Sequence, residues 1–141
     1  PSFPKRTTST STQREPQVNP PEFAKLMETT FSAIHALSAV KGGEYAPGDD
    51  RLSNFKEASR RLGNIPEQVL LVYLDKHYAS LCNYVKDLAS HKDRPRSEAV
   101  EGRVHDMIVY LLLFKGLLAE RRETASVLTE ASPLIWEDDD Q

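Results

Sequence analysis

The sequence predicts an all-α fold, arranged as an antiparallel four-helix bundle. Four segments carry apolar residues at helical spacing and none carries a sustained two-residue alternation. The connections between these segments are short, which favours antiparallel neighbours. The chain has 141 residues, the size of one compact domain. We therefore expect a single helical domain over residues 20–130, between a flexible N-terminal arm at 1–19 and an acidic C-terminal tail at 131–141.

The first two helices are predicted from their end signals. The first should begin after Asn19, where two prolines and a glutamate are typical of a first helical turn, and should stop at Gly42 and Gly43. Its apolar stripe consists of Phe23, Leu26, Met27, Phe31, Ile34 and Leu37. The second should run from about Asp50, with Asp49 or Asp50 as its cap, to Leu62, with Gly63 just past its end.

The third and fourth helices are expected to form most of the core. The third should begin near Pro66 and end at about Ala89, with a stripe of Leu70, Leu74, Tyr78, Leu81, Val85 and Leu88. The fourth should begin at Ser97 as N-cap and end at about Glu120, before a weaker segment at 125–130; its stripe is Val100, Val104, Met107, Ile108, Leu111 and Leu118. Gly102 inside this helix predicts close helix packing.

Composition excludes several classes of protein. The net charge is -3, from 18 basic and 21 acidic residues, which argues against a surface that binds nucleic acid or anionic lipid over its whole area. A single cysteine, Cys82, excludes an internal disulfide framework and multi-cysteine zinc sites. The longest apolar run, 107–114, has eight residues, too few to span a bilayer. We therefore expect a cytoplasmic protein with neither a membrane nor a specific nucleic-acid partner.

Polar residues flank the apolar stripes of the third and fourth helices. At helical spacing Arg103, Asp106 and Tyr110 share one sector of the fourth helix. A matching sector of the third helix carries Tyr73, Lys76, His77, Ser80 and Tyr84. If the two sectors face each other, they line a groove with cations, a carboxylate and aromatic rings, which suits an anionic ligand with a ring, such as a nucleotide.

The linker at 41–50 contains three glycines, a lysine, three acids and a tyrosine. Its glycines allow a phosphate to approach the backbone, although neither of the two common phosphate-loop patterns is present. An ordinary turn between two helix caps is the alternative interpretation. His35, His91 and His105 are isolated, so the sequence does not predict a zinc site.

Five short blocks together resemble a family of small bacteriophage proteins, similar to the MazG-like all-α nucleotide pyrophosphohydrolases and the nucleotide-modification-associated proteins. The resemblance covers about residues 37–120. The blocks are Lys41-x-x-Glu44-Tyr45-Ala46, Asp50-x-Leu52-x-Asn54-Phe55, Pro66-Glu67-Gln68-Val69, Tyr73-x-x-Lys76-His77-x-x-Ser80, and the run from Glu101-Gly102-Arg103 through Asp106 to Tyr110-Leu111.

The resemblance implies that the protein binds or hydrolyses a nucleoside triphosphate, with helix-borne carboxylates holding Mg²⁺, and that it self-associates as a homo-oligomer. Carried onto this sequence, the nucleotide-binding residues are Lys41, Tyr45, Asn54, Lys76, His77, Arg103 and Tyr110. Lys41, Lys76 and Arg103 would contact phosphate, and Tyr45 and Tyr110 would stack or orient the ligand. The candidate metal ligands are Glu44, Asp50 and Asp106.

The sequence departs from the MazG-like pattern at one important place. Those hydrolases carry a Glu-x-x-Glu pair, because two carboxylates one helical turn apart can share a hard cation. Here Glu57 is followed instead by Arg60 and Arg61. Whether the protein hydrolyses its nucleotide or only binds it therefore stays open.

The alternative function is that of a non-catalytic phage interaction protein, which sequesters a host nucleotide signal or docks on a host or virion complex through its tails. Leu134, Ile135 and Trp136 precede four consecutive acids, a pattern typical of a docking peptide with a tryptophan anchor. If the protein is phage-encoded, its location is the host cytoplasm.

Overall fold

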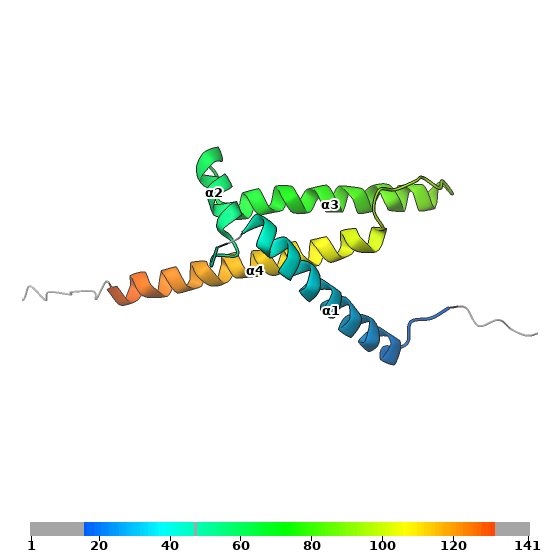
Figure 1. Ribbon diagram of the computed structural model, residues 1–141, viewed down its shortest axis with the longest axis horizontal. Helices are drawn as coiled ribbons and strands as arrows, with labels where there is room; N and C mark the ends of the chain where they lie inside the picture. The colour runs from blue at the N-terminus through cyan, green and yellow to red at the C-terminus, as the bar shows by residue number, and fades with distance from the viewer. Residues whose placement is uncertain (1–15, 47, 132–141) are drawn as a thin grey trace, which may run out of the picture.

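The computed structural model describes residues 16–46 and 48–131, and over these residues the chain is all-helical, without strands. The helices are α1 (Pro20–Tyr45), α2 (Ser53–Leu62), α3 (Pro66–Ala89) and α4 (Val100–Ala131), as Figure 1 shows. The predicted all-α class is confirmed. The expected docking residues Leu134, Ile135 and Trp136 lie outside the described residues, as does most of the expected N-terminal arm.

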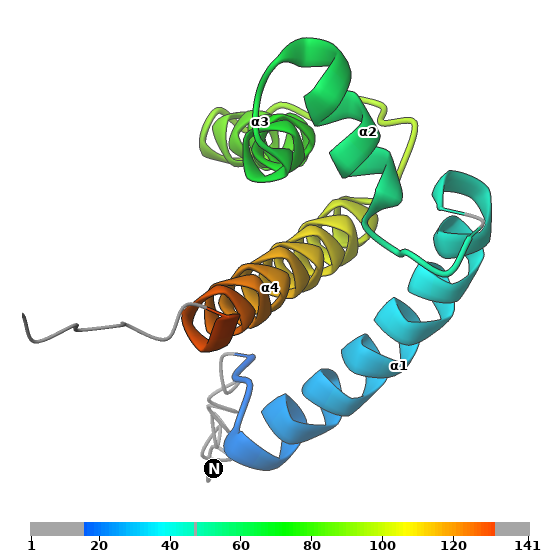
Figure 2. The same cartoon turned by 90° about the vertical axis from the view of Figure 1, so that its left-hand side faces the viewer.

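Helix α4 contacts both α3 and α1, and α2 packs on α3. Helices α3 and α4 run side by side in opposite directions, joined by the loop after Ala89 (Figure 1). The short α2 packs on α3, and α1 crosses α4, so that α4 lies between α3 and α1 (Figure 2). Residues from α1, α3 and α4 therefore meet where α1 crosses the α3–α4 pair.

The apolar core lies where α2, α3 and α4 meet. Its buried members are Leu52, Phe55, Val69, Leu70 and Leu117, with Ala58, Tyr110, Leu113 and Phe114 packed against them. Leu70 is completely buried, with an exposed fraction of 0%. This cluster fixes the α3–α4 pair beside the polar residues described below.

Helix α1 begins as predicted and ends later than predicted. The Asn19 side chain accepts a hydrogen bond from the Glu22 backbone N–H, and the Glu22 carboxylate accepts one from the Asn19 N–H, each at 3.0 Å. The expected stop at Gly42 and Gly43 is wrong, because the helix continues to Tyr45. Two glycines cost a helix about 2 kcal/mol. The last turns offset this cost through contacts with the rest of the chain, including the bond that Arg51 Nη2 donates to the carbonyl of Ser38, at 3.2 Å.

Helix α2 begins at Ser53, three residues later than predicted, with no side-chain cap at Leu52. Asp50 is not the cap: its Oδ1 accepts from the Leu52 N–H at 2.9 Å and its Oδ2 accepts from Lys56 Nζ at 2.8 Å. The carboxylate therefore organises the turn before the helix. The prediction for Gly63 is confirmed, since this residue ends α2 in the left-handed region with a φ of 71°.

The bounds predicted for α3 are confirmed, and those predicted for α4 are wrong at both ends. Helix α4 begins at Val100 rather than just after Ser97, and it continues without a break through the weaker segment to Ala131. The close packing predicted at Gly102 is also wrong, because nothing lies within 4 Å of the position that a Cβ would take there.

The buried faces of α3 and α4 are rotated away from the predicted apolar stripes. Tyr78, Val85 and Leu88 on α3 are more than half exposed, whereas His77 and Asp87 are buried. The two helices face each other through the sectors that carry polar and aromatic residues, which leaves apolar side chains on the outside. Helix α1 also exposes about half of each of four apolar side chains in its first half: Phe23, Leu26, Met27 and Phe31. No helix within the described ranges has the length and apolar character to cross a membrane.

Candidate functional site

A carboxylate, an imidazole and an ammonium group from three helices meet where α1 crosses α4. Lys41 on α1 donates a hydrogen bond to Asp106 Oδ1 on α4. The other carboxylate oxygen, Oδ2, lies 3.5 Å from His77 Nδ1 on α3. The side chains of His77 and Asp106 are 8% and 10% exposed, and that of Lys41 is 36% exposed. The pair is thus buried and the lysine remains accessible to solvent.

The surroundings of His77 keep its imidazole neutral. Burial lowers the pKa of His77 below its ordinary value; Asp106 raises it, and the positive charges of Arg103, Lys76 and Lys41 lower it further. The Nδ1 atom of His77 is buried and has no hydrogen-bond partner within the described part of the chain. A buried imidazole with an unused nitrogen is a hydrogen-bonding group available to a ligand.

Three aromatic rings pack beside this imidazole. The rings of Tyr73 and Tyr110 stack with centroids 6.2 Å apart and planes 13° from parallel. Phe55 on α2 meets both tyrosines edge-on, at 6.1 and 6.3 Å. The ring of His77 lies 5.4 Å from that of Tyr110. Burial raises the pKa of Tyr110, so its hydroxyl stays protonated and can donate a hydrogen bond.

The charges around His77 are predominantly positive. The charged groups that act on its pKa are Asp106, Arg103, Lys76 and Lys41, three cations and one anion. Arg103 also pairs with Glu98, so with a neutral imidazole this small region carries an excess of one positive charge. Such a region attracts an anion. The prediction that the polar sectors of α3 and α4 face each other is confirmed by the contacts of His77 with Asp106 and of Tyr73 with Tyr110.

Of the other expected nucleotide-binding residues, Tyr45 borders this region, and Asn54 is related to it through its neighbour Phe55. Tyr45 lies at the end of α1, is 62% exposed, and its charge contributes to raising the pKa of Tyr110. Asn54 lies in the first turn of α2, beside Phe55, and its Oδ1 is buried without a hydrogen-bond partner among the described residues. Together with Lys41, Lys76, His77, Arg103 and Tyr110, they complete the predicted nucleotide-binding set.

The expected metal ligands are not brought into one cluster. Asp50 is paired with Lys56, which also contacts Glu120 Oε1 at 2.8 Å, and this lysine is the largest cause of the lowered pKa of Asp50. Glu44 is exposed, and Asp106 is paired with Lys41. Residues 16–46 and 48–131 contain no group of three or more His, Cys, Asp or Glu side chains placed to hold a metal ion.

Two of the three rings beside His77 were absent from the predicted nucleotide-binding set. Tyr73 was expected only in the polar sector that lines the groove, and Phe55 only in one of the five sequence blocks. Tyr73 lies one helical turn before His77, and Tyr110 lies one turn after Asp106. Because α3 and α4 are antiparallel, this spacing places Tyr73 opposite Tyr110 and His77 opposite Asp106.

No family model, curated protein or solved structure matches the chain. The interpretation of the site therefore rests on its residues and their geometry.

Proposed function

We propose that this protein binds a nucleoside triphosphate at the His77–Asp106 site. The observation that carries the proposal is the contact of Lys41 with the buried Asp106 beside His77, directly next to the stacked rings of Tyr73 and Tyr110. An excess of positive charge next to aromatic rings matches the two ends of a nucleotide, its phosphates and its base. The resemblance of the sequence blocks to MazG-like phage proteins supports the same ligand class.

The residues divide into two groups under this proposal. The base stacks on the accessible tyrosines, since Tyr73 is 48% exposed and Tyr45 is 62% exposed. Lys41 exchanges part of its contact with Asp106 for a phosphate oxygen, which its exposed ammonium can reach. Asp106 is then a positioning residue, because it holds Lys41 at the crossing of α1 and α4. The Nδ1 atom of His77 faces Asp106 Oδ2 at 3.5 Å, so this imidazole and its carboxylate form the floor beneath the bound nucleotide.

In this proposal Mg²⁺ arrives bound to the phosphates of the nucleotide and is not held by a site of the protein. The candidate ligands Glu44, Asp50 and Asp106 do not share one cluster, and two of them are paired with lysines. These residues do not fit a resident cation site in this arrangement, and we derive no catalytic step through a metal. Binding is therefore the activity proposed, and pyrophosphohydrolysis is an outcome that the experiment below would reveal.

The test combines ligand-induced thermal stabilisation with phosphate and pyrophosphate release, over canonical and modified nucleoside triphosphates with and without Mg²⁺. We expect at least one nucleotide to stabilise the wild-type chain. The effect should fall in Lys41→Gln and Tyr110→Leu and persist in Lys25→Gln, which removes an exposed lysine from the same helix. Absence of any stabilising nucleotide, or equal stabilisation of Lys41→Gln, would refute the proposal. Turnover would extend it to catalysis.

A second candidate function is protein interaction, favoured by the apolar side chains that α1 exposes. Phe23, Leu26, Met27 and Phe31 occupy one stripe that no other described helix covers. A second copy of the chain that covers this stripe would produce the expected homo-oligomer. Sedimentation of the wild type against Phe31→Glu tests this: a fall in mass in the variant supports self-association, and a monomeric wild type contradicts it.

A further inference from the structure

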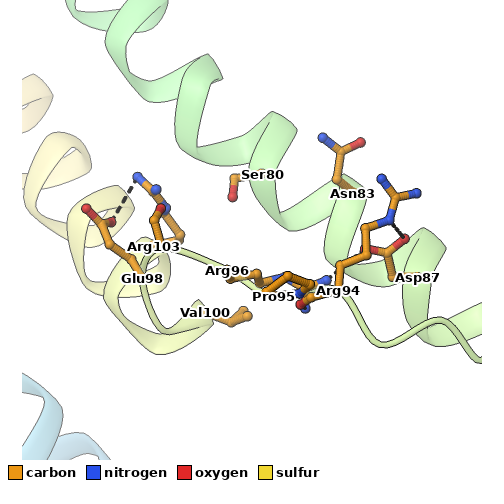
Figure 3. A pocket seen from close by; sticks show the side chains of 10 residues that line it. Ser80, Asn83, Asp87, Arg94, Pro95, Arg96, Glu98, Val100 and Arg103 are labelled. Carbon is orange, nitrogen blue, oxygen red and sulfur yellow. Dashed lines mark hydrogen bonds and ion pairs between the residues drawn. The ribbon is translucent and has the colours of Figure 1, made fainter.

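An open pocket of about 360 Å³ lies between the end of α3, the following loop and the start of α4. Arginine side chains line it on two sides: Arg94 and Arg96 come from the loop, and Arg103 comes from α4. Figure 3 shows Arg103 on one side, Arg94 beside Asp87 on the other, and Ser80 between them. The pocket is therefore a polar cavity with cations on opposite walls.

Two of the arginines are held in place by one buried carboxylate. Asp87 Oδ1 lies 3.0 Å from Arg94 Nε, and Asp87 Oδ2 accepts from Arg96 Nη2 at 2.9 Å. Arg96 also donates to the carbonyl of Arg94 at 3.2 Å, and its guanidinium lies 4.9 Å from the ring centroid of Tyr84. A guanidinium has five N–H donors, so each arginine keeps donors for a further acceptor. Because Asp87 already orders the two guanidinium groups, a ligand has less side-chain entropy loss to offset when it binds.

The opposite wall adds a third cation and the positive end of a helix. Arg103 pairs with Glu98 at 3.1 Å, and α4 begins at Val100, which also lines the pocket. The first turn of a helix presents unpaired backbone N–H groups and a partial positive charge. Three arginines against Asp87 and Glu98 leave the pocket with a net charge of +1 before the helix contribution is added. An anionic ligand fits this balance.

The pocket lies next to the His77 site along the same two helices. Ser80 follows His77 by three residues, and Arg103 precedes Asp106 by three residues. Three residues correspond to a rise of about 4.5 Å along a helix. Aromatic rings, the His77–Asp106 pair with Lys41, and the arginines thus follow one another along the α3–α4 pair, an order that places the base at the rings and the phosphates from Lys41 towards the arginines.

We propose that the Arg94–Arg96–Arg103 pocket binds the polyphosphate chain of the nucleotide. The identity of the ligand rests on the proposed function, whereas the pocket's selectivity for a phosphate chain does not. Guanidinium groups bind phosphate oxygens through paired, charge-assisted hydrogen bonds. The Asp87 carboxylate keeps two of them aligned until the phosphates arrive.

The direct test is calorimetric titration of the full chain with inorganic tripolyphosphate. Removing one or two arginines should weaken binding by about tenfold or more, because each hydrogen bond to a charged group contributes substantially. The variants are Arg103→Gln and the double variant Arg94→Gln/Arg96→Gln. The matched control is Lys115→Gln/Arg122→Gln, which removes two exposed charges from α4 well beyond the pocket and should change the affinity by less than about twofold.

A variant that is expected to bind tripolyphosphate more tightly separates the proposed effect from a loss of binding caused by misfolding. Glu98 is 56% exposed, so Glu98→Gln leaves the fold intact while releasing Arg103 from its partner. We expect tripolyphosphate to bind about threefold more tightly to this variant. No binding of tripolyphosphate to the wild type, or equal affinity for all variants, would overturn the proposal.

The same titrations separate this proposal from the nucleotide proposal. If nucleotides bind and Arg94→Gln/Arg96→Gln binds them as the wild type does, the pocket assignment fails and the His77 site stands. If tripolyphosphate binds through the arginines and no nucleotide binds, the pocket stands and the proposed function fails.

Discussion

Lys41 on α1 donates a hydrogen bond to the buried carboxylate of Asp106 on α4, and this bond connects two helices through residues that are 65 positions apart in the sequence. Lys41 lies in the last part of α1, which continues through Gly42 and Gly43 to Tyr45. The same carboxylate faces His77 on α3. One side chain of α4 therefore links α1 to the α3–α4 pair.

We expect Asp106→Ala to lower the free energy of unfolding by about 1–3 kcal/mol, because it leaves Lys41 and His77 without their shared partner. Urea denaturation measures the loss. The matched control is Asp49→Ala, since Asp49 is exposed and should cost less than about 0.5 kcal/mol. Equal stabilities of the two variants would mean that the link between α1 and α4 does not stabilise the fold.

His77 should make stability depend on pH in the mildly acidic range. Its pKa in the folded chain is lowered, chiefly by burial, whereas in the unfolded chain it is about 6.5. The unfolded chain therefore binds the proton more tightly. The contribution of the neutral imidazole is fully present above about pH 6.5 and decreases as the pH falls below that value.

Denaturation at pH 7.5 and pH 5.5 should accordingly show a smaller loss of stability on acidification in His77→Gln than in the wild type. His35→Gln serves as control, because His35 is exposed on α1 and should keep the wild-type dependence. A wild-type dependence in His77→Gln would contradict the buried, neutral state of this imidazole.

Much of the local structure could be predicted from the sequence, because the signals involved are local. The capping box at Asn19, the left-handed end of α2 at Gly63 and both ends of α3 follow from side chains within a few residues of each position. The end of α1 could not be predicted in this way. The contacts near this end of α1 involve residues outside the helix, such as those of Lys41 with Asp106 and of Ser38 with Arg51.

The sequence predicts which polar and aromatic residues of the candidate site share a helix face, and it predicts less well which face of each helix is buried. Helical spacing grouped Asp106 with Tyr110, and His77 with Tyr73, and these groups do face each other. The burial of this polar sector could not be predicted, because the apolar stripe of α3 assigns the buried face to residues such as Val85 and Leu88, which are exposed. The pairing of Asp50 with Lys56 also depends on where α2 starts, which is a non-local outcome.

The position of the core can be tested with two adjacent leucines on α3. Leu70 is completely buried between α2, α3 and α4, whereas Leu71 is 49% exposed. We expect Leu70→Ala to lower the free energy of unfolding by about 2–5 kcal/mol, from lost burial and a residual cavity. Leu71→Ala should cost less than about 1 kcal/mol. The reverse order, measured by urea denaturation, would place the buried face of α3 one residue away from that described.

Two glycines should respond to alanine with opposite signs. Gly63 has a φ of 71°, where an alanine Cβ is strained, so Gly63→Ala should lower the free energy of unfolding by about 1 kcal/mol. Gly102 lies in the first turn of α4 with nothing within 4 Å of an added Cβ. Here alanine only removes backbone freedom from the unfolded chain, and Gly102→Ala should raise the stability by up to about 1 kcal/mol. Paired thermal melts decide the matter: destabilisation by Gly102→Ala would indicate that a neighbour packs closely against this turn of α4, as the sequence alone suggests.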